Sequence, residues 1–450
     1  MSYSTYSKYL GTQIPWIGNL PSHWNLKSVK ELLCERIEKN DPIKTDFILS
    51  LTMDKGVIPY SEREGGGNKS KEDLTAYKLA YPNDIVMNSM NIIAGSVGLS
   101  KYFGAVSPVY YMLYPRDKNH SVHYFSKIFE SESFQKSLLG LGNGIMMKES
   151  VSSSKLNTIR MRIPMGKLNA QFLPCPPPVE QLAINEFLSI EMVKIDKLVT
   201  EQEKLIELLK EKRQAVISHA VTKGLIPENK MKDSGVERLG KVPENWDIKP
   251  IQWIASINDE VLPESTDVDY EIQYVDIGGV NLSSGVESSE LHKFKDAPSR
   301  ARRIVKHGDV IVSTVRTYLR AIAFVKEPPL NMIVSTGFAV IRSRSGLESN
   351  FAQFALQSTN FIDEVISRST GISYPAINAS ELAKIKIPLP PIEEQITISS
   401  YLNNQTFEID SLISESTKII ALLQERRSAL ITAAVTGQID VRNYQAKEIA

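Results

Sequence analysis

Arginine side chains gather between residues 300 and 320 of this 450-residue chain. Guanidinium groups hold phosphates and read the edges of guanine, and hydroxyl and aromatic groups among them suit contact with nucleic acid. A solvated charged face has the same composition, so the pattern alone leaves both interpretations open. The candidate DNA-contacting residues in this part of the chain are Lys293, Arg300, Arg302, Arg303, Arg316, Tyr318 and Arg320, together with Ser373 and Tyr374 of a later glycine loop.

The first half of the chain carries a sparser set of polar candidates. Lys69 and Lys71 follow a run of three glycines, and Asn88, Asn91 and Lys101 come later. An asparagine amide can pair with adenine through two hydrogen bonds, but asparagine is also a common turn residue. These five side chains are therefore hypotheses for DNA contacts in the first half.

Motifs for catalysis are missing from the sequence. Residues 140–144, Gly-Leu-Gly-Asn-Gly, have the glycines of a nucleotide-binding loop, but the residues before them favour a helix where such a loop requires a strand. Residues 65–70 lack the spacing of a phosphate-binding loop, and residues 94–98 lack the first glycine of a nucleophile elbow. No Asn-Pro-Pro-aromatic or Asp-Pro-Pro-Tyr tetrapeptide of an amino-methyltransferase occurs. We expect no catalytic residue in this chain.

Metal ligands are equally sparse. Asp117, His120 and His123 could share one face of a helix, but no fourth ligand accompanies them, so solvated surface residues explain them better. Cys34 and Cys175 lack metal-ligand spacing and fit a reducing compartment. No apolar run approaches the length of a membrane span, and the first residues lack the layout of a signal peptide. The sequence therefore predicts a cytoplasmic protein with no metal site and no membrane contact.

The elements that must position these side chains follow from an internal duplication. Residues 176–222 recur as residues 390–436 without a gap, and 21 of the 47 aligned residues are identical. Each copy begins with prolines, which suit the start of a helix, and then contains neither glycine nor proline. Apolar residues recur in each copy with a seven-residue period. The sequence predicts two helices of about 40 residues, each with an apolar seam that the other copy covers.

An antiparallel pairing of the two copies predicts five layers in the helix-pair interface. The central layer is polar, and such a layer fixes the register at some expense of stability. The layers pair Leu188 with Leu430, Ile195 with Leu423, Gln202 with Ser416, Leu209 with Ile409, and Val216 with Leu402.

A second, shorter repeat marks where the globular parts begin. Residues 17–24, IGNLPSHW, recur as residues 239–246, LGKVPENW, with Gly, Pro and Trp in register. The predicted fold class is α+β, with two globular α/β domains separated by two long antiparallel coiled-coil helices in a pseudo-two-fold internal repeat. The predicted segments are a first domain at residues 1–175, a first helix at 176–223, a second domain at 224–388, a second helix at 389–437 and a C-terminal tail at 438–450.

Short strands and helices are expected inside each domain. The strand-like runs are residues 84–87, 109–113, 309–312 and 334–342, and the helical segments are residues 121–139 and 350–366. A glycine loop comes late in each domain, at residues 142–147 and 370–374. We also expect residues 165–173 to be an insertion that only the first domain contains.

The formal net charge of zero weighs against contact with nucleic acid, because DNA-binding domains usually carry a basic excess. The charges are unevenly distributed, however. Six acidic residues lie between residues 259 and 271, and a basic run follows between residues 293 and 307. The zero is therefore an average over faces of opposite charge.

The repeats and the segments beside them resemble the specificity subunit of type I restriction-modification systems. The resemblance is carried by residues 220–246, AVTKGLIPENKMKDSGVERLGKVPENW, residues 387–395, IPLPPIEEQ, and residues 434–442, AVTGQIDVR. It covers nearly the whole chain. One departure lies at the first proline cluster, FLPCPPPVEQ at residues 172–181.

This resemblance implies a function. Each of two target-recognition domains is expected to read one half of a split sequence in double-stranded DNA. The helices are expected to hold the domains apart and to dock two modification (methyltransferase) subunits and, through them, restriction subunits. The cofactors S-adenosylmethionine, ATP and Mg are then expected on those partners, and none in this chain. Recognition domains of this family vary freely, so the candidate DNA contacts depend on their own chemistry.

Two other classes of function stay open. A non-catalytic coiled-coil scaffold or interaction protein would use the paired helices and bind protein with its domains, and the neutral net charge supports it. A stand-alone methyltransferase or nuclease would need the motifs that are missing. Binding to random DNA, with and without a partner subunit, separates these classes.

Overall fold

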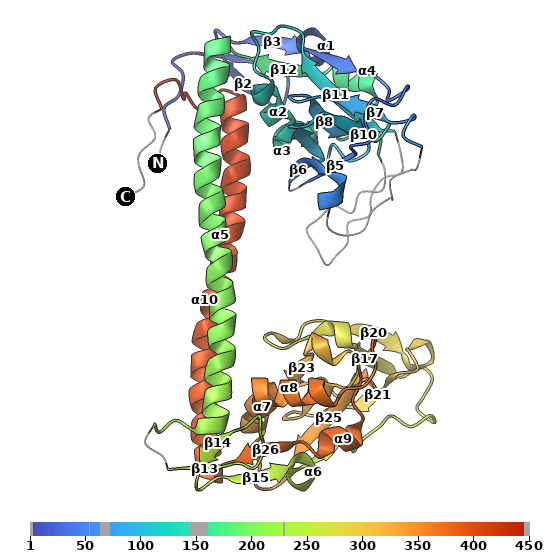
Figure 1. Cartoon of the computed structure of the whole chain (residues 1–450), viewed down its shortest axis with the longest axis vertical. Coiled ribbons are helices and arrows are strands. Elements are labelled where there is room, and N and C mark those ends of the chain that lie inside the picture. The colour runs from blue at the N-terminus through green and yellow to red at the C-terminus, as the bar shows by residue number, and fades with distance from the viewer. Residues whose placement is uncertain (1–2, 54, 64–72, 144–160, 228–229, 445–450) are drawn as a thin grey trace. The chain divides into compact units, whose positions relative to one another are not determined.

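The computed structural model describes residues 3–53, 55–63, 73–143, 161–227 and 230–444 (Figure 1). The chain divides into two compact units. Unit 1 consists of Met1–Glu201 and Ile419–Ala450, and unit 2 consists of Gln202–Lys418. The division crosses both long helices, so each unit contains a part of each helix. The boundaries predicted between the domains and the helices stay a prediction.

The two long helices expected from the duplication are present. Helix α5 spans Pro178–Lys223, and helix α10 spans Ile392–Val435. Prolines precede both helices, and a glycine with positive φ follows each, Gly224 (φ 76°) after α5 and Gly437 (φ 71°) after α10. Glycine reaches this left-handed conformation without steric cost and commonly ends a helix.

One buried glutamine near the start of each long helix fastens it to the globular part of its unit. In unit 1, the Gln181 amide donates to the carbonyl of Pro176 (2.9 Å) and accepts from the backbone N–H of Ser121 (2.8 Å). In unit 2, Gln395 donates to the carbonyl of Pro390 (2.8 Å) and accepts from the N–H of Glu348 (2.8 Å). Both side chains are fully buried, so each satisfies backbone groups that water cannot reach.

Within each unit, α5 and α10 lie side by side (Figure 1) and are joined by an arginine–aspartate ion pair. In unit 2, Arg213 of α5 binds Asp410 of α10 through two hydrogen bonds (2.9 and 3.3 Å). In unit 1, Arg427 of α10 binds Asp196 of α5. Shifting the first pair by the 214-residue repeat and exchanging the helices gives the second pair. The two helix segments of each unit therefore run antiparallel.

Most of the ten residues predicted for the helix-pair interface are buried. The core of unit 1 contains Leu188, Ile195 and Leu430, with Leu423 partly buried against it. In unit 2, Leu209, Ile409, Leu402 and Ser416 are buried, and Val216 packs against the core. The Oε1 atom of Gln202 is also buried and has no hydrogen-bond partner. The exact partners within each layer stay a prediction.

The centre of unit 1 is a four-stranded antiparallel sheet in the order β4-β11-β8-β9. Helices α2 and α3 contribute phenylalanines to the core that also holds the first turns of α5. The sheet consists of β4 (Leu33–Arg36), β8 (Ile85–Asn88), β9 (Val97–Leu99) and β11 (Tyr110–Pro115). The other pairs are β1 (Tyr9–Gly11) with β2 (Asn19–Pro21), β3 (Asn25–Ser28) with β12 (Phe172–Cys175), β5 (Leu49–Thr52) with β6 (Gly56–Pro59), and β7 (Lys78–Ala80) with β10 (Gly104–Val106). The helices of this unit besides α5 and α10 are α1 (Val29–Leu32), η1 (Tyr60–Glu62), α2 (Val122–Glu130), α3 (Glu132–Ser137) and α4 (Met165–Asn169).

Unit 2 repeats this sheet. The sheet β16-β25-β22-β23 has the strand order of β4-β11-β8-β9. A second sheet of unit 2 has the order β20-β17-β24-β21, and its counterpart in unit 1 is the pairs β5–β6 and β7–β10, which a parallel bridge between Ile48 and Ala105 joins. The strands are β16 (Ala255–Ile257), β17 (Glu271–Val275), β20 (Glu290–Lys293), β21 (Ala301–Ile304), β22 (Val310–Ser313), β23 (Ile322–Phe324), β24 (Met332–Ser335) and β25 (Phe338–Ser343). The smaller pairs are β13 (Met231–Asp233) with β14 (Lys241–Pro243), β15 (Asp247–Pro250) with β26 (Lys386–Leu389), and β18 (Val280–Asn281) with β19 (Gly285–Val286). The helices are α6 (Ile251–Ile254), η2 (Ile277–Gly279), η3 (Phe294–Asp296), η4 (Thr317–Leu319), α7 (Ser349–Gln357), α8 (Thr359–Arg368) and α9 (Ala379–Ala383).

The structure corrects three details of the sequence analysis. Residues 334–342 are not one strand, because a turn at Thr336 and Gly337 separates β24 from β25, which belong to different sheets. The helical segments 121–139 and 350–366 are each broken at an extended serine, Ser131 and Ser358. Residues 165–173 are not an insertion, because α4 and β12 correspond to α9 and β26 at the same shift of 214 residues. The repeat therefore extends upstream of the prolines without a gap.

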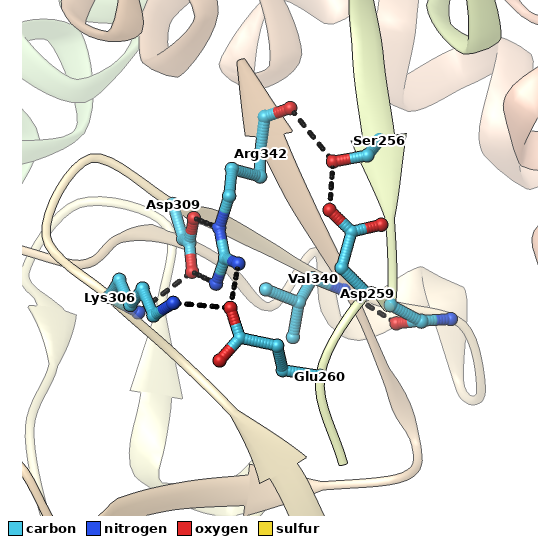
Figure 2. A network of polar contacts seen from close by, with 8 residues as sticks. Ser256, Asp259, Glu260, Lys306, Asp309, Val340 and Arg342 are labelled. Atoms are coloured by element: carbon cyan, nitrogen blue, oxygen red, sulfur yellow. Dashed lines mark hydrogen bonds and ion pairs between the residues drawn. The ribbon is translucent and has the colours of Figure 1, made fainter. Parts of the chain in front are cut away.

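A buried aspartate at the start of a central strand organises the same turn in both units. Asp309 is 1% exposed, accepts the N–H of Lys306 (2.7 Å) and binds Arg342 of β25 through two 2.8 Å hydrogen bonds. Figure 2 shows that Glu260 joins this network between Arg342 and Lys306. The hydrogen bonds from Lys306 and Arg342 lower the pKa of Glu260.

In unit 1 the corresponding aspartate pairs with an arginine from a different strand. Asp84 accepts the N–H of Tyr81 (2.9 Å) and pairs with Arg36 of β4 (2.8 Å). The position in unit 1 that corresponds to Arg342 is Tyr114, because both face the second residue of the neighbouring strand, β4 or β16. The arginine has moved from one strand to its neighbour while the aspartate has stayed.

We predict that replacing Gln202 and Ser416 together with leucine stabilises unit 2. The unpaired Gln202 Oε1 costs about 1–3 kcal/mol in a buried site, and the leucines add apolar contact. Urea unfolding of the full chain should therefore show a gain of about 1–3 kcal/mol, with a looser helix register because the polar layer is gone. Glu203→Leu, at an exposed neighbouring position, should give no gain. A loss of stability in the double variant would contradict a polar layer at this point.

The aspartate network of unit 2 predicts two unequal effects. Arg342→Met leaves Asp309 buried without its cation and should cost about 3 kcal/mol. Lys306→Met removes an exposed partner of Glu260 and should cost less than about 1 kcal/mol. Urea unfolding of each variant, with hydrogen exchange measured on β22 and β25, checks both values. Equal losses would mean that the Asp309–Arg342 pair does not organise the turn.

Candidate nucleic-acid interface

The basic residues of unit 2 divide into those with an acidic partner and those without. Lys293 and Lys295 both bind Asp269 (3.2 and 2.9 Å). The hydrogen bonds from Lys295 and Lys293 lower the pKa of Asp269. Lys306 binds Glu260. These lysines are therefore neutralised within the unit, which weakens the prediction that Lys293 is free to bind DNA.

Six arginines of unit 2 have no ion pair within the described part of the chain, and one of them, Arg344, was not a candidate from the sequence. The other five, called here the five unpaired arginines, are Arg300, Arg302, Arg303, Arg316 and Arg320. Arg302 lies over the ring of Phe294, with its guanidinium carbon 4.7 Å from the ring centre. Burial lowers the pKa of Arg303, whose Nε atom has no hydrogen-bond partner. The basic excess that the net charge hides is therefore carried by arginines.

Two of these arginines hold unusual backbone conformations. Arg316 and Arg320 flank the single turn η4 between β22 and β23, with φ values of 52° and 53°. A residue other than glycine rarely adopts this left-handed conformation, and each instance costs about 1–3 kcal/mol. Such strain is concentrated at binding and active sites, where the surrounding structure enforces it.

The turn is held in place by a second loop, residues 369–377. The hydroxyl groups of Thr317 and Ser369 are 2.9 Å apart, and the N–H of Ile377 donates to the carbonyl of Thr314 (2.8 Å). The guanidinium carbon of Arg316 lies 5.1 Å from the centre of the Tyr374 ring. The structure therefore brings together Arg316 and Tyr374, which the sequence offered as separate candidates.

Apolar side chains complete this surface. Leu319 and Ile372 lie on the same two loops, and Ile372 is fully exposed at 103%. We call the surface formed by the two loops the arginine–aromatic patch, and it consists of Arg316, Tyr318, Leu319, Arg320, Ile372, Ser373 and Tyr374. Sequence reasoning missed Leu319 and Ile372. The only signal was the place of Ile372 directly after a turn glycine.

The candidates of unit 1 are less concentrated. The Asn88 Oδ1 atom accepts the N–H of Met90 (3.1 Å), so this side chain supports a turn. Asn91 makes no side-chain hydrogen bond to the described residues and is half-buried. Lys101 is exposed, without an acidic partner in that part of the chain. Lys69 and Lys71 lie outside the described residues.

A pocket of about 390 Å³ in unit 1 adds residues that the sequence analysis did not select. Glu35, Tyr111, Asn143 and Arg162 line it together with Lys78, whose Nζ donates to the carbonyl of Tyr110 (2.9 Å) and lies 3.8 Å from Glu35. Burial lowers the pKa of Lys78. The lysine and the glutamate of this pocket form an ion pair.

The structure contains no group of three or more His, Cys, Asp and Glu side chains suited to a metal ion among its described residues. Of the three residues weighed as ligands, His120 is hydrogen-bonded to Gln181 (2.9 Å), and Asp117 accepts the N–H of Asn119. None of the helices in the described ranges is long and apolar enough to cross a membrane.

Comparison with known families identifies one domain in the chain. Residues 243–421 match the family described as type I restriction modification DNA specificity domain. The matched segment contains the arginine–aromatic patch, all five unpaired arginines and the first part of α10.

Two curated proteins of Methanocaldococcus jannaschii are similar to nearly the whole chain. The putative type I restriction enzyme MjaX specificity subunit is 24% identical over 455 residues, covering 95% of this chain and 96% of that protein. The type I restriction enzyme MjaVIII specificity subunit is 23% identical, covering 94% and 95%.

Solved structures share the fold. One of them is a chain from a structure described as “Structural basis underlying complex assembly and conformational transition of the type I R-M system”. It aligns with a TM-score of 0.66 at 15% identity, and the alignment covers 92% of this chain and 98% of that one. The crystal structure of the HsdS subunit from Thermoanaerobacter tengcongensis aligns with a TM-score of 0.50 at 15% identity, covering 93% and 98%. Residues 243–421 thus match the DNA specificity domain of type I restriction-modification systems, and nearly the whole chain is similar to proteins named as their specificity subunits.

Proposed function

We propose that this chain is the sequence-specific DNA-binding specificity subunit of a type I restriction-modification complex. It recognises a two-part site in double-stranded DNA and docks modification subunits and, through them, restriction subunits. The observation that carries the proposal is the set of five unpaired arginines, with the arginine–aromatic patch, inside the matched specificity domain.

The patch has the chemistry that binding to DNA requires. Arginine holds phosphates and pairs with guanine in the major groove, and an exposed tyrosine or aliphatic tip can pack against sugars, bases or the thymine methyl group. Three acidic residues of the same unit, Asp269, Glu260 and Asp309, do not oppose this role, because basic partners occupy them. A net charge of zero is therefore compatible with a basic surface.

The duplication supports a two-part recognition site. Each unit carries the same central sheet and the same aspartate-organised turn, yet the side chains around them differ. Two DNA-binding units that share a scaffold but differ in their surfaces suit two half-sites of different sequence. The helices that connect the units would then set the distance between the half-sites.

A repeated row of exposed apolar residues on the helices supports docking of partner subunits. On α5, Leu198, Leu205 and Leu208 share one face because they are seven and three residues apart. The residues 214 positions later, Leu412, Ile419 and Leu422 on α10, are exposed in the same way. We call these six residues the exposed seam. Two equivalent sets suit two copies of a modification subunit. Each copy would pack the apolar face of a helix against one set.

Catalysis and its cofactors belong to those partners in this proposal. S-adenosylmethionine would bind the modification subunits, and ATP and Mg the restriction subunits. The purified chain alone should neither methylate nor cut DNA. The alternative, a scaffold that binds only protein, accounts for the exposed seam but not for the strained and unpaired arginines.

DNA binding is tested by replacing each of the five arginines with alanine in the complex assembled with the modification subunit. Loss of a base-reading arginine should cost about 1–3 kcal/mol of affinity and relax one position of the site. Loss of a phosphate contact should weaken binding to all DNA sequences alike. It should also reduce the slope of log affinity against log salt concentration by about one. Binding isotherms at several salt concentrations separate the two effects. Unchanged affinity and salt slope for all five variants would favour the scaffold function.

Docking is tested with Leu208→Glu and Leu422→Glu in the same chain. Both side chains are exposed, at 53% and 63%, so the fold should tolerate the change while co-purification of the modification subunit falls at least about tenfold. Leu182→Glu with Ile396→Glu is a matched control, because these residues are also exposed and related by the repeat but lie on another face of their helices. Equal loss in both double variants would exclude the exposed seam as the docking surface.

A further inference from the structure

The hairpins β8–β9 of unit 1 and β22–β23 of unit 2 enclose loops of the same length. The last pair of the first hairpin is Met87 with Val97, and that of the second is Val312 with Ile322. The enclosed loops are therefore residues 88–96 and 313–321. Each residue of the first loop corresponds to the residue 225 positions later.

The backbones of the two loops share four hydrogen bonds. The bonds of unit 1 join Asn88 N–H to Ser96 O (3.0 Å), Ala94 N–H to Asn91 O (3.1 Å), Gly95 N–H to Ile92 O (2.9 Å) and Ile163 N–H to Ser89 O (2.9 Å). Those of unit 2 join Ser313 to Ala321 (2.9 Å), Leu319 to Arg316 (2.9 Å), Arg320 to Thr317 (3.1 Å) and Ile377 to Thr314 (2.8 Å). Gly95 and Arg320 also share a positive φ.

The two loops are anchored at the same position. Ile92 and its counterpart Thr317 are both buried, at 1% and 4% exposure. The residue before the anchor is Asn91 in one loop and Arg316 in the other. These two residues therefore hold the same place in their loops, although Arg316 has a positive φ (52°), Asn91 does not, and their chemistry differs.

The polar groups at the ends of both side chains make no hydrogen bond to the described residues. Asn91 makes no side-chain hydrogen bond to the described residues, in contrast to Asn88, which supports the turn. Arg316 has no ion pair or side-chain hydrogen bond there, and its contact is the Tyr374 ring. Stacking on a ring fixes the plane of a guanidinium and leaves its N–H edge free for a two-bond contact.

We propose that residues 91 and 316 are equivalent base-reading positions, with Asn91 recognising an adenine in one half-site and Arg316 a guanine in the other. This inference rests on the proposed function and adds which residues read which bases. Asparagine pairs with the N6 and N7 atoms of adenine, and arginine with the O6 and N7 atoms of guanine. The shared frame of the loop lets one position recognise a different base without a change of fold.

The test reads the methylated sequence genome-wide in cells that express the chain with its modification partner. Arg316→Asn should change one guanine position of one half-site and leave the other half-site as it is. Asn91→Ser should relax one adenine position of the other half-site. Arg344→Asn is the matched control, because Arg344 is exposed in unit 2 and has no acidic partner in the described ranges. It should leave the whole sequence unchanged.

A second measurement covers variants that no longer support methylation. Competition binding of the assembled Arg316→Asn and Arg316→Lys complexes to duplexes with each base at each position should show guanine preference reduced about ten- to hundredfold at one position. An unchanged base preference at every position, or changes in both half-sites, would overturn the inference. A wild-type complex that recognises no split sequence would instead remove the proposed function itself.

Discussion

The fastening of each globular part to a long helix depends on one buried glutamine amide. Gln181 and Gln395 each satisfy a proline carbonyl at the helix start and the backbone N–H of the residue before an earlier helix, α2 or α7. An apolar residue in their place would leave these buried groups without partners, and each such group costs about 1–3 kcal/mol. Because the amide bonds mainly to backbone, with the His120 ring as a further partner of Gln181, it constrains the path of the chain more than the identity of the neighbouring side chains. The surrounding sequence could therefore diverge while the attachment stayed.

Other contacts are also kept in both units while the side chains around them differ. The aspartates Asp84 and Asp309 hold the same turn, although their arginines come from neighbouring strands. The central sheets share their strand order, and the loops that follow β8 and β22 share their main-chain hydrogen bonds. Unit 2 differs in the side chains that its loops present, among them the arginine–aromatic patch. The features that the two units share are mainly backbone contacts, and those that differ are outward side chains. A scaffold that presents different DNA-binding surfaces requires this division.

Much of the fold could be predicted because its signals are local or repeated. The duplication, the prolines and the seven-residue period predict α5 and α10, and both are present. The breaks at Ser131 and Ser358 and the turn between β24 and β25 were missed, because tertiary packing decides them. The interface candidates stay a prediction, and the sequence alone could not sort them. The neutralisation of Lys293 by Asp269 and the stacking of Arg316 on Tyr374 join residues 24 and 58 positions apart.

The central claim is that one scaffold presents two independent readers of DNA, and a hybrid chain tests it most directly. The ladders β3–β12 and β15–β26 close the two globular parts at matching points, so residues 247–389 can be replaced by a copy of residues 25–175. The measurement is the methylated sequence in cells that express this hybrid with the modification partner. Our account predicts that both halves of the recognised site become the half-site of unit 1. A site that retains its original second half, or an active hybrid that recognises an unrelated sequence, would contradict it.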